Sequence, residues 1–272
     1  MLKRPDGEIY YELSGHGPPV LMIQGVGVTG EGWRLQIRTL EKGFQTLTFD
    51  NRGIGQSVSW NGAVTIESMA ADARALMDAV GWESAHVVGH SMGGVIAQQL
   101  ALDVPSRVRS LSLLCTFARG KDAARITPWV LWMALRTRLG TRRRRRNAFL
   151  QMLFPPDYLR AADRDRLAVE VAAIIGRDLA DSPPVLIKQV QALSRHDASG
   201  RLGQLKGIPA LVVAARHDPI ALPKYGRQLA QLIPGATFHE MAGSSHGVII
   251  QEADEISRRL EQFFRAADSA HG

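Results

Sequence analysis

Short β-rich runs alternate with longer helical patterns over most of this 272-residue chain. Apolar residues recur at helical spacing in residues 65–80, 95–102 and 249–264, and Thr65 is a candidate N-cap for the first of these helices. Because strands that are separated by helices pair in parallel, this order predicts an α/β fold with a mostly parallel sheet. The predicted strands span residues 8–13, 20–24, 45–49, 85–89, 109–114, 209–215 and 236–241.

The alternation stops in residues 117–201, where prolines interrupt helical patterns and no strand is evident. An insertion of helices into an α/β pattern suggests a lid over the carboxyl edge of the sheet, where open sheets bind their ligands. We therefore expect a core domain made of residues 1–116 and 202–272, with residues 117–201 as a helical cap.

Three large side chains of the predicted cap are candidates for the wall of a substrate pocket. They are Trp129, Trp132 and Met133. Apolar, aromatic and sulfur-containing side chains line most ligand pockets, but a stripe of them more often serves ordinary packing. Both interpretations stay open at this point.

Positive charge is concentrated in the same segment. The net charge is +7, and the excess lies in Arg136, Arg138 and the run Arg142 to Arg146. We interpret the run as the solvated end of a helix, with an anionic partner or lipid headgroup as the alternative. Because no aromatic residues interleave these arginines, the sequence does not predict a nucleic-acid groove.

The sequence carries no export or membrane signal that we recognise. Residues 1–11 lack the apolar stretch of a secretory signal, and the longest apolar runs, such as 129–135, fall far short of the about 18 residues of a spanning helix. The single cysteine, Cys115, has no partner for an intramolecular disulfide. We expect a cytoplasmic protein without stable membrane insertion, and the oligomeric state stays open.

A serine stands on a glycine-rich turn between a predicted strand and a predicted helix. Residues 89–93 read Gly-His-Ser-Met-Gly, which is the G-x-S-x-G nucleophile elbow in its required strand–turn–helix context. Glycines are needed on both sides of the serine because side chains there would collide with the neighbouring strand and helix. The elbow makes Ser91 the candidate nucleophile. The Met92 N–H, at the positive end of the helix, is a candidate donor to the oxyanion.

Further motifs stand at the ends of other predicted strands. They are DNRGIGQS at 50–57, ARHDP at 215–219 and AGSSHG at 242–247. Together with the elbow, they resemble the α/β-hydrolase family over most of the chain outside the cap, in the family's order of serine, acid and histidine. The resemblance implies a mostly parallel, eight-stranded α/β-hydrolase sheet with flanking helices and a helical cap insertion. It also implies a structural role for residues 50–57.

The resemblance implies a catalytic triad of Ser91, Asp218 and His246. A serine hydroxyl is a poor nucleophile until a neutral imidazole accepts its proton, and a carboxylate must hold that imidazole in one tautomer. His246 takes the role of the base and Asp218 that of the carboxylate. Other residues of the same types also lie near predicted strand ends and remain alternatives: His90, His217, His239, Asp197 and Glu240.

The loop after the strand at 20–24 has two interpretations. In the family it supplies the second oxyanion donor, which we assign to the Val26 N–H, although Gln24 stands where the family usually has histidine. The same loop reads G-x-G-x-x-G at 25–30, with Asp50 about 20 residues further on, as in dinucleotide-binding sites. The Glu-Gly-Trp that follows at 31–33, in place of a closely packed helix, argues against a dinucleotide. We therefore expect no organic cofactor and no metal.

The triad predicts a serine hydrolase that works through an acyl-serine intermediate. The resemblance to the family implies that its substrate is a small-molecule carboxylic ester. Hydrolysis of lactones or of carbon–carbon bonds uses a similar triad on the same fold and is the first alternative. A member of the fold that binds a ligand without turning it over is the second. Dehalogenases and epoxide hydrolases of the family carry an aspartate at the elbow, and Ser91 argues against both.

Overall fold

The computed structural model describes residues 1–57, 60–123, 132–133 and 135–271. Its main sheet has seven strands in the order β3-β5-β4-β6-β7-β8-β9. Only β3 runs antiparallel to its neighbour, and the other neighbouring pairs are parallel. The α/β-hydrolase class expected from the sequence is therefore confirmed. The strands are β3 (Tyr11–Ser14), β4 (Pro19–Ile23), β5 (Gln45–Phe49), β6 (Ala85–His90), β7 (Val108–Leu114), β8 (Ala210–Ala215) and β9 (Thr237–Met241).

The number of strands differs from the eight that we expected. The first two strands, β1 (Leu2–Arg4) and β2 (Gly7–Ile9), pair with each other as a separate two-stranded sheet. A tight turn at Pro5 and Asp6 joins them, because proline fixes the φ angle that such a turn needs and aspartate tolerates turn geometry. Those residues are therefore paired locally and add no strand to the main sheet.

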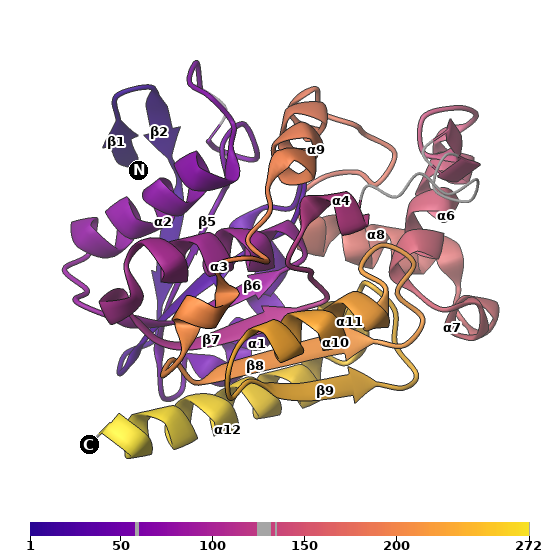
Figure 1. Cartoon of the computed structure of the whole chain (residues 1–272). Helices are drawn as coiled ribbons and strands as arrows, with labels where there is room; N and C mark the ends of the chain where they lie inside the picture. Colours follow the sequence, from indigo (N-terminus) through magenta and orange to yellow (C-terminus); the bar gives the residue numbers. More distant parts are fainter. Residues whose placement is uncertain (58–59, 124–131, 134, 272) are drawn as a thin grey trace.

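Helices cover both faces of the main sheet. α2 and α3 contact each other on one side of the sheet, and α12 lies on the other side, where it contacts α1 (Figure 1). The Thr65 cap is confirmed, since its side chain and that of Ser68 form a reciprocal capping box. The helix expected at 249–264 is divided into two at Glu252. The covering helices are α1 (Arg34–Leu40), α2 (Ile66–Ala79), α3 (Met92–Asp103), α10 (Pro223–Leu232), α11 (Val248–Gln251) and α12 (Ala253–His271).

The described residues of the segment between β7 and β8 form helices joined by turns and loops, and the segment has a hydrophobic cluster of its own. Apolar side chains of α6, α7 and α8 bury one another there, with Phe154 and Val171 at 1% and 0% exposure. Figure 1 places these three helices together at one end of the molecule. The division at residues 117 and 201 remains a prediction. The helices are α4 (Gly120–Ala123), α6 (Arg142–Leu153), α7 (Pro156–Ala161), α8 (Arg164–Ile175) and α9 (Val185–Arg195).

Among the described residues, no helix is both long enough and apolar enough to cross a lipid bilayer. The arginine run forms the first turns of α6, after the cap residue Thr141. Arg142, Arg143 and Arg144 are exposed there, as expected for the solvated end of a helix, while the two arginines that follow are half-buried.

Candidate active site

Ser91 stands on a strained turn between β6 and α3. Its backbone lies at φ 55° and ψ −122°, a conformation that non-glycine residues rarely adopt. A Cβ on Gly89 would lie 2.3 Å from the Gly93 carbonyl oxygen, and one on Gly93 would lie 2.0 Å from that of Ile23. Neither position therefore admits a side chain. The turn is held by a hydrogen bond from the Ser91 N–H to the Leu114 carbonyl, at 2.9 Å.

The structure brings together the three residues that we expected as a triad. His246 Nε2 lies 3.1 Å from Ser91 Oγ, and His246 Nδ1 lies 2.7 Å from Asp218 Oδ2. The second carboxylate oxygen of Asp218 accepts hydrogen bonds from the N–H groups of Ile220 and Ala221, both at 2.8 Å. Asp218 is thus buried and fixed by backbone donors while it orients the imidazole. This arrangement can activate a serine hydroxyl.

The alternative acids and bases occupy other places. Glu240 forms ion pairs with Arg216 and Arg227, and Asp197 is exposed and accepts hydrogen bonds from Ser199. His217 is exposed, and the pKa of His239 is lowered by burial and by the Arg259 charge. Within the described part of the chain, none of these side chains is hydrogen-bonded to Ser91 or His246.

His90, the residue before the nucleophile, is buried against the catalytic imidazole. Its Nε2–H donates to the His246 carbonyl oxygen at 3.0 Å, and the two ring centroids lie 5.0 Å apart. Burial, with the neighbouring His246 as the next cause, lowers the pKa of His90 to about 3. His90 is therefore neutral at physiological pH, and it supports the position of His246 as a hydrogen-bond donor.

A consequence for stability can be measured. The unfolded chain protonates His90 near its usual pKa of about 6.5, whereas the folded chain does so only near 3, so folding loses stability as the pH falls between these values. From pH 7 to pH 5, the free energy of unfolding of the wild type should fall by about 2 kcal/mol more than that of His90→Phe. Urea denaturation of both proteins at each pH tests this. Equal losses would contradict it.

The loop after β4 lies against the nucleophile. A Cβ built on Gly25 would lie 3.4 Å from Ser91 Oγ, so the loop backbone is in reach of the reacting atoms. The Val26 N–H, our candidate oxyanion donor, makes no hydrogen bond within the described part of the chain. The Met92 N–H is at the first position of α3 and has no helical carbonyl partner four residues before it. Both assignments remain predictions.

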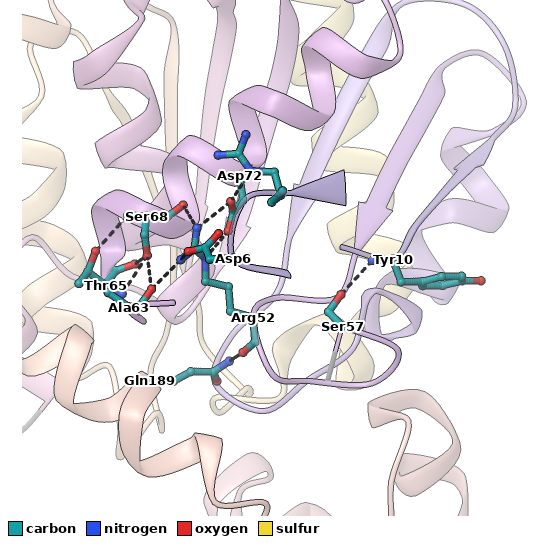
Figure 2. Close-up of polar contacts among 10 residues, drawn as sticks. Asp6, Tyr10, Arg52, Ser57, Ala63, Thr65, Ser68, Asp72 and Gln189 are labelled. Carbon is teal, nitrogen blue, oxygen red and sulfur yellow. Dashed lines mark hydrogen bonds and ion pairs between the residues drawn. The ribbon is translucent and has the colours of Figure 1, made fainter. Parts of the chain in front are cut away.

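Gly27, the next residue of this loop, is held by two side chains from the segment between β7 and β8. Its N–H donates to Gln189 Oε1 at 2.9 Å, and its carbonyl accepts from Arg177 Nε at 3.1 Å. Gln189 is fully buried, and its Nε2 donates to the Arg52 carbonyl at 3.2 Å (Figure 2). These hydrogen bonds, which we call the Gly27 latch, fix the loop next to Val26. Sequence analysis did not identify either latch residue.

The segment at 50–57 is structural, as the resemblance implied. The Arg52 guanidinium is buried and forms ion pairs with Asp72 and Asp6 (Figure 2). It also stacks on the Trp60 ring. The Asp50 carboxylate accepts hydrogen bonds from the N–H groups of Gly30 and Gln56, both at 2.8 Å. Its oxygens are thus occupied by backbone donors of the glycine loop and of its own segment. Asp50 does not have the position of a ribose-binding acid.

A cavity of about 480 Å³ opens onto Ser91 and His246. Its wall is mostly apolar, and Phe149, Leu186 and Val190 from α6 and α9 are among the side chains that form it. The wall residues of α9 were not predicted, although the amphipathic pattern of this helix is visible in the sequence. Of the pocket residues that we predicted, Trp129 lies outside the described residues.

The two other predicted pocket residues lie outside this wall. Trp132 is 53% exposed, and its indole ring stacks with the Arg136 guanidinium. Met133 is buried in packing, at 1% exposure. Trp132 and Met133 therefore serve surface contact and ordinary packing, which was the alternative interpretation.

Among the described residues, one group offers atoms that a metal ion could bind. His90, Cys115 and His246 are buried, and their ligating atoms lie within 4.8 Å of one another. However, His246 is already bonded on both ring nitrogens, to Asp218 and to Ser91. Burial, together with the nearby Asp218 carboxylate, raises the pKa of the Cys115 thiol, and a protonated thiol is a poor ligand. The bonds of His246 and the protonated thiol of Cys115 therefore do not favour a metal at this place.

The fold and the site have the architecture of an α/β hydrolase, and comparison with known proteins agrees. Residues 18–253 match the family described as alpha/beta hydrolase fold. The chain therefore belongs to the α/β-hydrolase family and is a hydrolase.

Relatives of this chain cleave different bonds, according to their names. A protein of Azorhizobium caulinodans named "Putative carbamate hydrolase RutD" is 30% identical over 268 residues, which cover 95% of both chains. The enol-lactonase of Burkholderia xenovorans LB400 is 28% identical with a TM-score of 0.78, over 95% of this chain and 97% of that one. A hydrolase of Pseudomonas aeruginosa PA01 is 25% identical with a TM-score of 0.77, over 94% and 93%.

Proposed function

We propose that this hydrolase cleaves the carboxylic-ester bond, in open-chain esters or in lactones, through an acyl-enzyme formed on Ser91. The observation that carries the proposal is the continuous chain of contacts from Asp218 through His246 to Ser91 Oγ. The contact geometry supports hydroxyl attack on an acyl carbon. The similarity to an enol-lactonase favours including lactones.

Each residue has a defined task in this mechanism. Ser91 Oγ attacks the carbonyl carbon while its proton moves to His246 Nε2, and Asp218 stabilises the resulting imidazolium. The negative charge that develops on the carbonyl oxygen is stabilised by the N–H groups of Val26 and Met92. His246 then gives its proton to the leaving oxygen, and a water molecule activated by the same imidazole releases the acid.

A substrate panel separates the bonds that this site can cleave. It contains p-nitrophenyl esters of increasing acyl length, a series of γ- and δ-lactones, and an aryl carbamate, because one relative carries a carbamate-hydrolase name. We expect turnover of esters or lactones and a mass increase of one acyl group on Ser91 when the reaction is quenched. Turnover of the carbamate alone, or no covalent adduct with any substrate, would contradict the proposal.

A further inference from the structure

A positive charge without a counter-ion lies in the wall of the catalytic cavity. Arg177 lines the cavity together with Ser91. Among the described residues, its guanidinium donates to backbone carbonyls alone, those of Gly27, Asp178 and Asp181. No carboxylate of the described residues lies within ion-pair distance of it. Burial lowers the pKa of this guanidinium, against the raising effect of the two aspartates. A half-buried cation of this kind is stabilised when an anion pairs with it.

The carboxylates nearest in sequence are already committed elsewhere. Asp178 pairs with Arg142 and Arg146, and Asp181 pairs with Arg142 at 3.1 Å. The hydrogen bond from Arg146 is the main cause that holds the pKa of Asp178 well below its usual range. Arg142 and Arg146, the first and last residues of the arginine run, thus neutralise the acids beside the cavity. As a result, Arg177 remains available to an incoming anion.

A second cation lies in the same wall. Arg138 is exposed, lines the cavity, and has no ion pair within the described part of the chain. The wall also contains the carboxylate of Asp181, which is paired with Arg142. Apart from these charges, the wall is largely apolar, which strengthens an interaction between a cation and a bound anion.

We propose that the substrate carries a carboxylate in its acyl portion and that Arg177 binds this carboxylate. This inference rests on the proposed function and narrows its substrate class. Arg177 is bonded to Gly27, whereas Gly25, two residues earlier, lies against Ser91, and two residues span at most about 7 Å. The carboxylate is therefore a few carbon atoms from the reacting carbonyl. The leaving group has to face His246, which protonates it, so the acyl portion extends along the loop.

The test compares two esters of equal length that differ in charge: the p-nitrophenyl monoester of glutaric acid and p-nitrophenyl pentanoate. We expect the wild type to prefer the anionic ester in kcat/KM. In Arg177→Met, the ratio of anionic to neutral ester should fall by about 10- to 100-fold, as expected for losing a charged hydrogen-bond partner. Arg177→Lys should keep part of the preference, since it keeps the positive charge but loses the fixed donor positions of the guanidinium.

Two control variants separate charge recognition from support of the loop. Because Arg177 also holds the Gly27 carbonyl, its loss disturbs the oxyanion loop. Gln189→Met breaks the Gly27 latch without changing charge, so it should lower kcat for both esters by the same factor and leave their ratio unchanged. Arg166→Met removes an exposed arginine that pairs with Glu170, away from the cavity, and should leave both rates and the ratio unchanged.

Failure of this inference is distinguishable from failure of the proposed function. If Ser91 is acylated by both esters without preference for the anionic one, or if Arg177→Met keeps the wild-type ratio, the carboxylate site is overturned while the esterase survives. Glutarate binding to Ser91→Ala protein, measured by calorimetry with and without Arg177→Met, tests the site independently of turnover and overturns it if the affinities are equal.

Discussion

Replacing Ser91 with alanine is expected to lower kcat/KM for an activated ester by about 10⁴- to 10⁶-fold, since removing a triad nucleophile has effects of this size. The free energy of unfolding should change little, because Ser91 lies on a turn that the glycines and the Leu114 carbonyl hold in place. Rates with p-nitrophenyl butyrate and urea denaturation measure the two quantities.

The matched control for this variant is Ser112→Ala. Ser112 is fully buried in the neighbouring strand β7, and its hydroxyl has no hydrogen-bond partner among the described residues, so losing it should leave turnover nearly unchanged. If Ser91→Ala retains more than a few per cent of the activity in a clean preparation, the nucleophile is another residue.

The second large effect concerns Asp218. An asparagine in its place would present an amide to His246 Nδ1 and favour the wrong imidazole tautomer, a change that costs about 10⁴-fold in kcat in a serine protease. We expect a loss of similar size in Asp218→Asn, with little change in KM. Steady-state kinetics on the same ester check this.

Asp197→Asn and Glu240→Gln are the controls, because both carboxylates were alternatives in the sequence and both are bonded elsewhere in the structure. They should retain wild-type turnover. A large loss in either of them, together with an active Asp218→Asn, would show that the acid has been assigned to the wrong residue.

Local patterns allowed the parallel sheet and the positions of Ser91, Asp218 and His246 to be predicted. Each of these residues follows a parallel strand of the sheet, and carboxyl ends of parallel strands meet at one edge of a sheet, so chain order alone brings the loops together. Thr65 was predictable for a similar reason, since a cap depends on residues within one helical turn.

The remaining features depend on contacts between distant segments. The Gly27 latch joins residues more than 100 positions apart. The sequence around a glutamine in an amphipathic helix does not indicate that its side chain bonds to a distant loop. The lack of an ion pair for Arg177 among the described residues could not be predicted for the same reason. It depends on Arg142 and Arg146, which pair with the neighbouring Asp178. The separate pairing of β1 with β2 was missed for another reason, since the strand expected at 8–13 spans the end of β2 and most of β3.

The Gly27 latch also limits how this enzyme can diversify. Substrate preference in a fold like this changes when the inserted helices are exchanged or mutated, as long as the reaction centre stays intact. Here, an exchange of the inserted helices would remove Gln189 and Arg177, which hold the loop that carries Val26. A graft that alters selectivity without slowing the reaction must therefore bring an acceptor for the Gly27 N–H and a donor for its carbonyl. The inserted helices and the loop after β4 are thus joined at Gly27, and we expect these two segments to evolve together rather than independently.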